Sequence, residues 1–389
     1  MINLFHALDH NMGTRINHKY LWRRLARSLR THKRRSNLNT TLSRAPNIFQ
    51  SKYMSSKIDP SLRMYEVLTE GSYNVLPQQN IPPSITIPPY ALPDDPEDWW
   101  KHNFANLIPL RHKPKRGIDI KDDVNLERMR NAGKIGRIVL NCAKAMCQPF
   151  VTPEKLDLIV HMTCLENGAY PSPLKYKGFP KSVCTSVNNV VVHGIPDDRP
   201  LENGDIINVD VSVFIDGVHG DLSETMMVGK VDSAGRKLVQ ATKDCLDEAI
   251  KVCGPGQRFN QIGKTVTRVA ADHGFKVCPM FTGHGIGKCF HEPPQILHTD
   301  NNRAGVMKPG MTFTIEPVLV EGSPEVDFWG DGWTCVTRDG GRAAQFEHTL
   351  LITEEGVDIL TEDHESLHPT DMDIRIYWNY VTPGCVRIF

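Results

Sequence analysis

Polar and apolar side chains alternate from Asn208 to Val213, and Ile215 continues the apolar face. Alternation with a period of two predicts a β-strand whose apolar face packs against a core. Asp216-Gly217 follows directly and predicts a tight turn, because a two-residue hairpin needs positive φ at its centre. A second strand-like run returns from Val218. The pattern therefore predicts a β-hairpin over residues 208–223.

The predicted hairpin brings two carboxylates onto its polar face. The register that the turn imposes places Asp210 opposite Ser223 and Ser212 opposite Asp221, so the aspartates are diagonal neighbours roughly 7–8 Å apart at the backbone. Converging carboxylates repel each other unless a proton or a cation lies between them. Turn-forming or solvated aspartates are the ordinary alternative. Because the other face is apolar and packed, we hypothesise a metal site here.

Helical periodicity surrounds the hairpin. Apolar residues recur at helical spacing from Asp123, and Thr152-Pro153-Glu154 begins a second predicted helix that continues to Gly168. Further helices are predicted over 236–252 and 259–273, and strands over 190–192, 313–316, 334–336 and 346–352. Helices mixed with hairpins predict an α/β (α+β) domain with a largely antiparallel sheet.

Composition divides the chain into four segments. Residues 1–58 hold twelve Lys or Arg against one acid, Asp9, and seven prolines between Pro77 and Pro96 favour extended chain. We predict a basic presequence-like segment at 1–58, a proline-rich linker or surface arm at 59–118 that Trp99-Trp100 pin to the body, a catalytic domain at 119–365, and a C-terminal extension at 366–389.

The basic segment has the composition of a mitochondrial transit peptide. Its apolar residues Leu21, Trp22, Leu25 and Leu29 recur at helical spacing among arginines, and an amphipathic, arginine-rich, acid-poor N-terminus is typical of such peptides. The alternatives are a basic tail that contacts nucleic acid or ribosomes, or a nuclear signal in Lys33-Arg34-Arg35. We expect a mitochondrial location, with the cytoplasm as the alternative.

The remaining composition excludes several classes of protein. Hydrophobic residues make up 40% and charged residues 23% of the chain, which is ordinary for a soluble globular protein. Apolar runs are too short for a transmembrane helix. The ten cysteines begin at Cys142 and form no CxxC pair, so we expect a reduced intracellular protein without a disulfide framework or zinc finger.

Three more residues are candidates for metal ligands. His284 lies between Gly283 and Gly285, whose missing side chains would let a ligand or metal approach the backbone. Glu316 falls on the polar face of its predicted strand, and Glu347 lies within a well-packed run. Singly, each has an ordinary explanation as an exposed edge residue or a loop residue.

Five blocks that contain these candidates resemble a known family. They are YPSPLKYKGFPKSVCTSVNNVVVHGIP, NVDVSVFIDGVHGDLSETMMVG, GHGIGKCFHEPP, MTFTIEPVLVEGSPE and RAAQFEHTLLIT. The chain resembles the type I methionine aminopeptidases over about 120–365. Glu316 follows His284 without the insertion of the type II enzymes, and no cysteine precedes Cys142, so the zinc-finger extension of the cytosolic type I enzymes is missing. The overall pattern is similar to the mitochondrial form.

The resemblance implies a pita-bread fold, with a largely antiparallel curved sheet flanked by helices and an extended N-terminal arm. It implies a dinuclear-metal aminopeptidase that removes the initiator methionine when the next residue is small. Asp221 and Glu347 would bridge both ions, Asp210 would bind the second, and His284 and Glu316 would bind the first. This oxygen-rich ligand set suits Mn, Fe or Co ions better than a thiolate site would, with Zn as a further candidate.

The resemblance also assigns catalytic and substrate-binding residues. Glu316 would take and return the proton of the bridging water. His291 would steady the scissile carbonyl, and His193 would contact the substrate backbone. The pocket for the first side chain would be lined by Tyr176, Phe179, Cys184, Phe290 and Trp333, whose rings and sulfur make polarizable contacts with a methionine thioether.

The expected partners are the N-termini of nascent or newly imported polypeptides, with the ribosome as a further candidate. We expect no direct contact with nucleic acid or membrane, and a monomer. Two other functions compete with this one. A proline-directed peptidase of the same fold is disfavoured by the length before Asp210 and by the block from Tyr170 to His193. An inactive relative that binds ribosomes or nucleic acid would lose metal ligands, whereas all five are present here.

Overall fold

The predicted hairpin is the longest strand pair in the computed structural model, which describes residues 63–92 and 117–364. β4 (Ile206–Ile215) pairs antiparallel with β5 (Val218–Met227) in the predicted register, with Asp210 opposite Ser223 and Ser212 opposite Asp221. Asp216 has φ 53° and Gly217 has φ 82°, as a primed turn requires. The predicted hairpin and its register are confirmed.

All strand pairs in the described residues are antiparallel and fall into four sheets. β4 also pairs with β1 (Tyr170–Pro171) and β2 (Cys184–Val187). The sheet with the most strands, five, has the order β15 (Val357–Ile359), β14 (His348–Ile352), β9 (Thr312–Ile315), β7 (Thr282–Gly285) and β8 (Glu292–Leu297). The two three-stranded sheets are β13 (Ala343–Gln345), β10 (Val318–Val320), β6 (Lys276–Val277), and β11 (Val326–Phe328), β12 (Cys335–Thr337), β3 (Val190–Val192).

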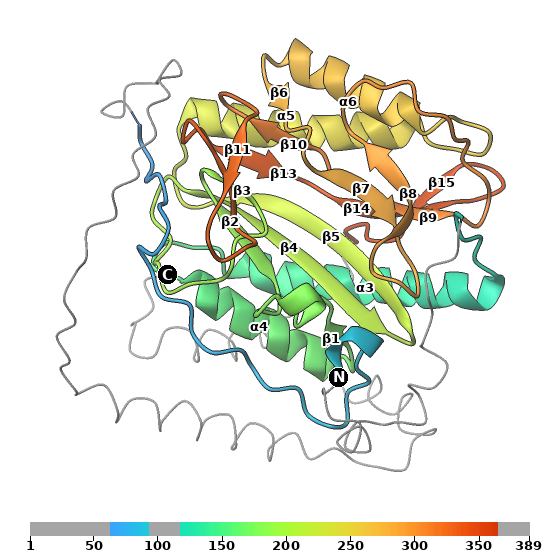
Figure 1. The fold of residues 1–389 in the computed structure, drawn as a ribbon, viewed down its shortest axis with the longest axis horizontal. Coiled ribbons are helices and arrows are strands. Elements are labelled where there is room, and N and C mark those ends of the chain that lie inside the picture. The colour runs from blue at the N-terminus through green and yellow to red at the C-terminus, as the bar shows by residue number, and fades with distance from the viewer. Residues whose placement is uncertain (1–62, 93–116, 365–389) are drawn as a thin grey trace. The chain divides into compact units, whose positions relative to one another are not determined.

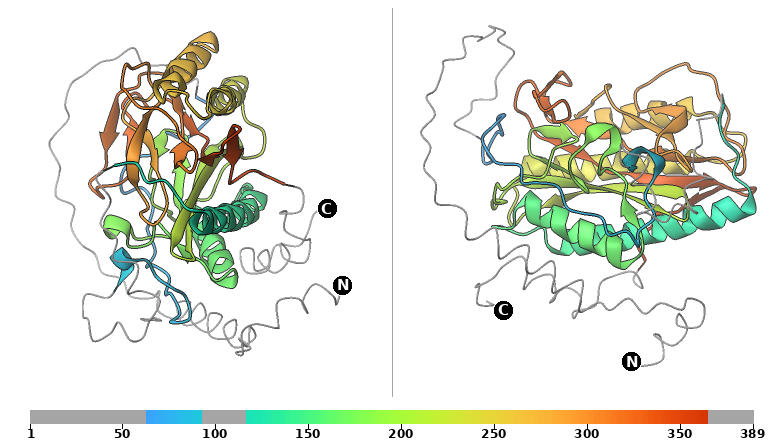
Figure 2. Two further views of the ribbon diagram at one scale, coloured as in Figure 1. Left: turned by 90° about the vertical axis from the view of Figure 1, so that its right-hand side faces the viewer. Right: turned by 60° about the horizontal axis from the view of Figure 1, so that its bottom comes forward.

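Helices cover the sheets on two sides (Figures 1 and 2). α3 (Asp123–Ala145) and α4 (Pro153–Glu166) lie on the side of β4 and β5, and α5 (Ser233–Lys251) and α6 (Asn260–Asp272) lie on the other side. The predicted helix starts are confirmed, because the side chain of Asp122 accepts a hydrogen bond from the Asn125 amide and that of Thr152 accepts one from the Lys155 amide.

The predicted strand over 346–352 is wrong in one respect. β13 ends at Gln345 and β14 begins at His348, and the two strands belong to different sheets. Between them, the backbone of Glu347 turns to β5, where its amide donates to the Ser223 carbonyl at 2.9 Å. Glu347 therefore lies where two sheets meet the hairpin, not within a continuous strand.

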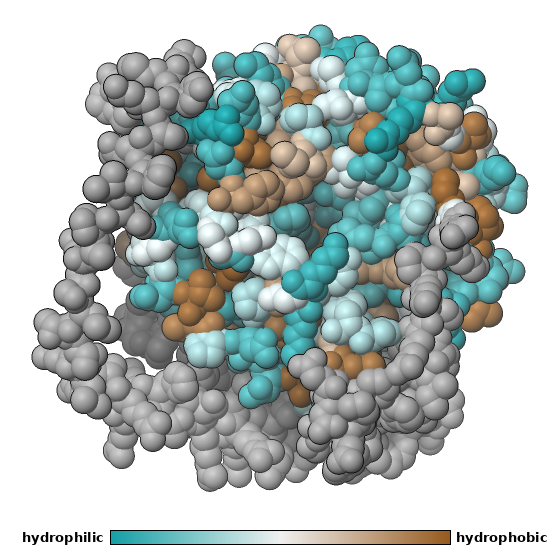
Figure 3. All heavy atoms as spheres, in the orientation of Figure 1, coloured by the Kyte–Doolittle hydropathy of each residue, from teal (hydrophilic) through white to brown (hydrophobic). Residues whose placement is uncertain are grey.

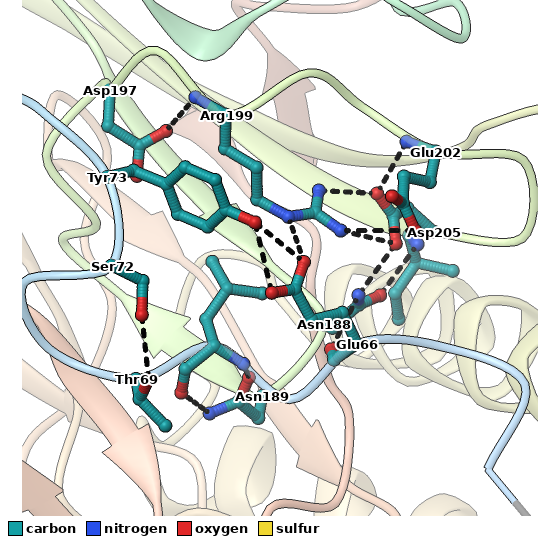
Figure 4. Close-up of polar contacts among 12 residues, drawn as sticks. Glu66, Thr69, Ser72, Tyr73, Asn188, Asn189, Asp197, Arg199, Glu202 and Asp205 are labelled. Atoms are coloured by element: carbon teal, nitrogen blue, oxygen red, sulfur yellow. Dashed lines mark hydrogen bonds and ion pairs between the residues drawn. The ribbon is translucent and has the colours of Figure 1, made fainter.

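Residues 63–92, here called the described arm, lie against the catalytic body. The guanidinium of buried Arg199 contacts Asp205 at 2.6 Å and Glu66 of the arm at 2.7 Å. Tyr73 donates to the same Glu66 carboxylate, and Leu68 exchanges hydrogen bonds with the Asn189 side chain (Figure 4). Farther along, the arm forms a 3-10 turn, η2 (Pro89–Ala91). The arm residues Ile85, Ile87 and Ala91 pack in a small core cluster with Tyr170, Leu174 and Phe214 of the body.

The segments 1–58 and 366–389 and the pair Trp99-Trp100 lie outside the described residues, and the four predicted segment boundaries stay predictions. Within the described residues, no helix has both the length and the apolar character needed to cross a membrane. On the face drawn in Figure 3, hydrophilic side chains predominate near α6 and apolar ones are scattered among them.

Candidate metal centre

One cavity collects every residue that the sequence nominated for the site. It has a volume of about 150 Å³, and its lining also includes Pro173, Lys177 and Ser212. The nominated residues in the lining are Tyr176, Phe179, Cys184, His193, Asp210, Asp221, His284, Phe290, His291, Glu316, Trp333 and Glu347. The convergence that the prediction required is therefore present, whereas the individual roles stay predictions.

The two aspartates come from the polar face of the hairpin. Asp221 is buried, and the hydroxyl of Ser212 directly opposite donates to its Oδ1 at 2.7 Å. The Thr349 hydroxyl of β14 donates to the backbone carbonyl of Asp221 at 2.7 Å and accepts from its amide at 3.1 Å. These contacts leave Asp221 Oδ2 for the side chains gathered around it.

The other three candidate ligands come from separate strands. His284 lies in β7, Glu316 directly follows β9, and Glu347 lies between β13 and β14. His284 Nε2 is 3.6 Å from Asp221 Oδ2 and 3.6 Å from Glu316 Oε1. One ligand atom each from Asp221, His284 and Glu347 lie within 4.8 Å of one another, close enough for all three to contact a single ion.

The glycines beside His284 have a different use from the predicted one. A Cβ on Gly283 would lie 2.3 Å from the Thr314 carbonyl oxygen, and one on Gly285 would lie 2.1 Å from that of Pro293. Both glycines therefore permit β7 to pack closely between its neighbouring strands, and they do not open the backbone to a ligand. His284 is a strand residue, and its amide donates to Thr314 Oγ1 at 3.1 Å.

Burial and mutual repulsion perturb the carboxyl groups. Burial raises the pKa of Asp210 well above its ordinary value, and the charges of Asp221 and Glu316 raise it further. Burial also raises the pKa of Glu347 strongly and that of Glu316 to about 7. For His284, burial lowers the pKa, but the Asp221 and Glu316 carboxylates outweigh it and the pKa is raised. The site favours bound protons or cations.

Divalent cations fit this donor set. Glu347 is buried, and among the described residues its Oε1 has no hydrogen-bond partner, which is costly for a carboxylate unless a cation contacts it. Four carboxylates and one imidazole are the hard and intermediate donors that Mn²⁺, Fe²⁺ or Co²⁺ accept. Glu316 is oriented by Thr314, which donates to Oε1 at 2.9 Å, and by Gln345, which donates to Oε2 at 3.2 Å.

The model of metallopeptidase family M24 matches residues 127–354. The chain belongs to metallopeptidase family M24. It is 46% identical to methionine aminopeptidase 1D, chloroplastic/mitochondrial, of Arabidopsis thaliana over 74% of this chain and 78% of that protein. It is 50% identical to the mitochondrial methionine aminopeptidase 1D of Homo sapiens over 64% of this chain and 75% of that protein.

Solved structures share the fold of this chain. The methionine aminopeptidase of Rickettsia prowazekii is 42% identical and superposes with a TM-score of 0.62 over 63% of this chain and 100% of that chain. The prolidase of Pyrococcus furiosus, 21% identical with a TM-score of 0.52 over 63% of this chain and 66% of that chain, shares the fold alone. The predicted family resemblance, pita-bread fold and enzyme class are confirmed, and the chain is a metal-dependent aminopeptidase.

The two other histidines of this M24 site are neutral near pH 7. Burial lowers the pKa of His193 to about 4, and burial together with the charge of His284 lowers the pKa of His291. A neutral imidazole has one N–H donor and one acceptor nitrogen. Each ring can therefore donate a hydrogen bond to a carbonyl oxygen without adding a positive charge to the site.

Aromatic rings form one wall of the cavity in this M24 enzyme. Tyr176 packs on Phe290 with ring centroids 4.8 Å apart, and Phe179 meets Trp333 edge-on at 5.2 Å. Cys184 is buried and lies opposite Asp210 in the β2–β4 register. The apolar wall therefore begins one strand away from the carboxylates.

Sequence reasoning missed several supporting residues. Ser212 and Thr314 orient Asp221 and Glu316, and their parity along the strands could have indicated it. His219 is buried, and its ring stacks on Phe290 at 5.1 Å with an interplanar angle of 9°. Its neighbours in the sequence carry no signal of that role.

Proposed function

We propose that the chain removes the initiator methionine from polypeptides whose second residue is small, using two divalent metal ions. The observation that carries the proposal is the convergence of five predicted ligands, one with an unpartnered buried oxygen, beside an aromatic wall in one cavity. The ligands would be Asp210, Asp221, His284, Glu316 and Glu347. When bound, the ions would polarise the scissile carbonyl and lower the pKa of the attacking water.

The remaining steps belong to the side chains. Glu316 accepts a proton from the attacking water and returns it to the leaving amine, and its hydrogen bonds to Thr314 and Gln345 hold it in place for both transfers. Neutral His291 donates a hydrogen bond to the carbonyl oxygen as negative charge develops there. Neutral His193 donates to the substrate backbone and fixes its direction in the cavity.

The size and lining of the cavity support the substrate preference. The cavity, of about 150 Å³, is lined by both the candidate ligands and the aromatic wall, so a single apolar side chain can lie beside the carboxylates. Aromatic rings and the Cys184 sulfur offer the polarizable surface that a methionine sulfur favours.

The natural substrates under this proposal are the N-termini of nascent or newly imported polypeptides. Relatives named mitochondrial and the basic composition of residues 1–58 support a mitochondrial location. The ribosome is a candidate partner, and a monomer is the proposed state. Fractionation of cells that express the full chain tests the location, because a full-length protein found only in the cytosol contradicts it.

Hydrolysis of Met-Ala-Ser in the presence of Mn²⁺ or Co²⁺ tests the activity. We expect turnover by the wild-type protein and none by Glu347→Ala or His284→Ala, with metal content measured in parallel by mass spectrometry. Equal activity in the wild type and in Glu347→Ala would contradict the metal assignment. Cleavage of Ala-Pro in place of Met-Ala-Ser would favour a proline-directed peptidase.

A further inference from the structure

The described arm delivers one aromatic ring to the back of the cavity wall. Tyr90 lies in the η2 turn (Pro89–Ala91), and its hydroxyl donates to the Ser172 carbonyl at 2.6 Å. Its ring meets Tyr176 edge-on with centroids 5.0 Å apart, and stacks on His219 at 6.1 Å with an interplanar angle of 18°. Tyr90 does not line the cavity itself.

Tyr176 connects this contact to the centre of the site. On its cavity side, its ring stacks on His291 at 5.1 Å with an interplanar angle of 11°. It begins the short turn η5 (Tyr176–Gly178), and Lys175 just before the turn and Lys177 within it have φ values of 64° and 49°. Residues other than glycine seldom adopt this left-handed conformation, so surrounding contacts must hold the turn in place.

A second contact runs through His219 to the same wall. Its ring stacks on Phe290 at 5.1 Å, and its Nδ1 is 2.9 Å from the Ser172 hydroxyl. Tyr90 thus contacts the Ser172 carbonyl, the Tyr176 ring and the His219 ring. Through His219 it is connected to Phe290, the second aromatic residue of the wall. Tyr90 therefore packs against the wall from outside the cavity.

We propose that Tyr90 is a positioning residue that fixes Tyr176 and Phe290 and so sets the size of the pocket for the substrate's first side chain. The inference rests on the proposed function, since it gives the arm a part in methionine selectivity. The described arm would then contribute to substrate selectivity through the ring of Tyr90.

Kinetics on Met-Ala-Ser and on its longer analogue ethionine-Ala-Ser test the proposal. For Tyr90→Ala we expect KM for Met-Ala-Ser to rise about five- to tenfold, the effect that loss of one aromatic pair can produce, with kcat changed less. The preference for methionine over ethionine should fall by a similar factor. Tyr90→Phe keeps the ring and should retain wild-type selectivity.

Ile87→Ala is the matched control, because Ile87 is buried in the same core cluster. It should lower the melting temperature without changing the methionine-to-ethionine ratio. If Ile87→Ala and Tyr90→Ala change that ratio equally, general loosening of the arm explains the effect and the proposal is wrong. Unchanged KM and ratio in a folded Tyr90→Ala protein would also overturn it.

A double-mutant cycle with Tyr176→Ala tests the route of action. If Tyr90 acts through Tyr176, the double variant should have a KM only slightly above that of Tyr176→Ala. A KM increase equal to the product of the two single-variant increases would count against the proposal. Binding of L-methionine to the Mn²⁺-loaded protein separates this from the proposed function. A wild type that binds methionine but cleaves no peptide refutes only the activity, whereas equal binding by wild type and Tyr90→Ala refutes the positioning role.

Discussion

Ser212 lies between the two aspartates of the hairpin and is not itself a candidate ligand. Its hydroxyl donates to Asp221 Oδ1 at 2.7 Å and fixes the carboxylate plane from the neighbouring strand. Residues that orient ligands in this way are typically worth a factor of about 10–100 in metal affinity. We therefore predict that Ser212→Ala weakens Mn²⁺ binding about tenfold, as measured by isothermal titration.

Ser223→Ala is the control for this prediction. Ser223 is also buried in the hairpin, but its hydroxyl accepts from Asn208 at 3.3 Å and, in the part of the chain that the structure describes, makes no hydrogen bond with a candidate ligand. Its substitution should leave Mn²⁺ affinity within about twofold. Wild-type affinity in Ser212→Ala would show that Asp221 is held by its other contacts alone.

Among the elements, those with strong local signals were predictable. The β4–β5 register follows from the turn at Asp216-Gly217, because a two-residue loop leaves one pairing that keeps the apolar face buried. Caps and periodicity likewise placed α3 and α4. Short strands such as β6 and β7 were not predicted, since two to four residues hold too few periodic positions and pair through contacts distant in sequence.

The residues of the site also divide into those with a local sequence signal and those placed by contacts distant in sequence. Asp210 and Asp221 could be paired from local alternation, whereas Glu347 could be placed only by family resemblance, because its position depends on a bridge to Ser223 far away in the chain. His219 had no local signal at all. Its stacking on Phe290 arises from the packing of separate strands, which no single stretch of sequence encodes.

Attachment of the described arm leads to a prediction about stability. Glu66 contacts the buried guanidinium of Arg199 at 2.7 Å and accepts from Tyr73 (Figure 4). Glu66→Ala removes both contacts and leaves Asp205 as the main counter-charge. Hydrogen bonds to charged groups contribute about 1.5–3 kcal/mol when buried, and Glu66 is partly exposed, so we predict a loss of about 1–2 kcal/mol in the free energy of unfolding by urea.

Glu70→Ala in the same arm is the matched control. Within residues 63–92 and 117–364, the one hydrogen bond that the Glu70 carboxylate accepts comes from the Gly330 amide, in an exposed position. Its loss should cost less than about 1 kcal/mol, in line with exposed polar contacts. Equal unfolding free energies for Glu66→Ala and the wild type would indicate that Asp205 alone compensates Arg199.

For the whole molecule, the M24 fold does not by itself determine the substrate. The Pyrococcus furiosus prolidase shares the fold at 21% identity, so specificity must come from the residues around the metal ligands. Here those residues are an aromatic wall and the arm packed behind it. The candidate metal centre thus lies beside an aromatic wall that Tyr90 of the described arm contacts.

The same centre should make folding depend on both pH and metal. In chelated protein, burial raises the pKa of Glu316 to about 7 from an ordinary value of 4.5. Between these values the folded state holds a proton that the unfolded state has released, so stability falls as pH rises. His284, with its raised pKa, acts in the same direction. At about 1.4 kcal/mol per pKa unit, Glu316 alone contributes on the order of 3 kcal/mol.

We therefore predict that, in urea unfolding of EDTA-treated protein, the stability of the wild type relative to Glu316→Gln decreases from pH 5 to pH 7, because the buried histidines with lowered pKa values, such as His193, act alike in both proteins. Excess Mn²⁺ should reverse the trend, because the ion binds the ionised carboxylates and stabilises the folded state more as they lose protons. Glu316→Gln removes one titrating group, so the stability of its chelated form should fall less, or rise more, between pH 5 and 7. The buried acids elsewhere, such as Asp157, affect wild type and variant alike. Identical slopes for the two chelated proteins would contradict a raised pKa at Glu316.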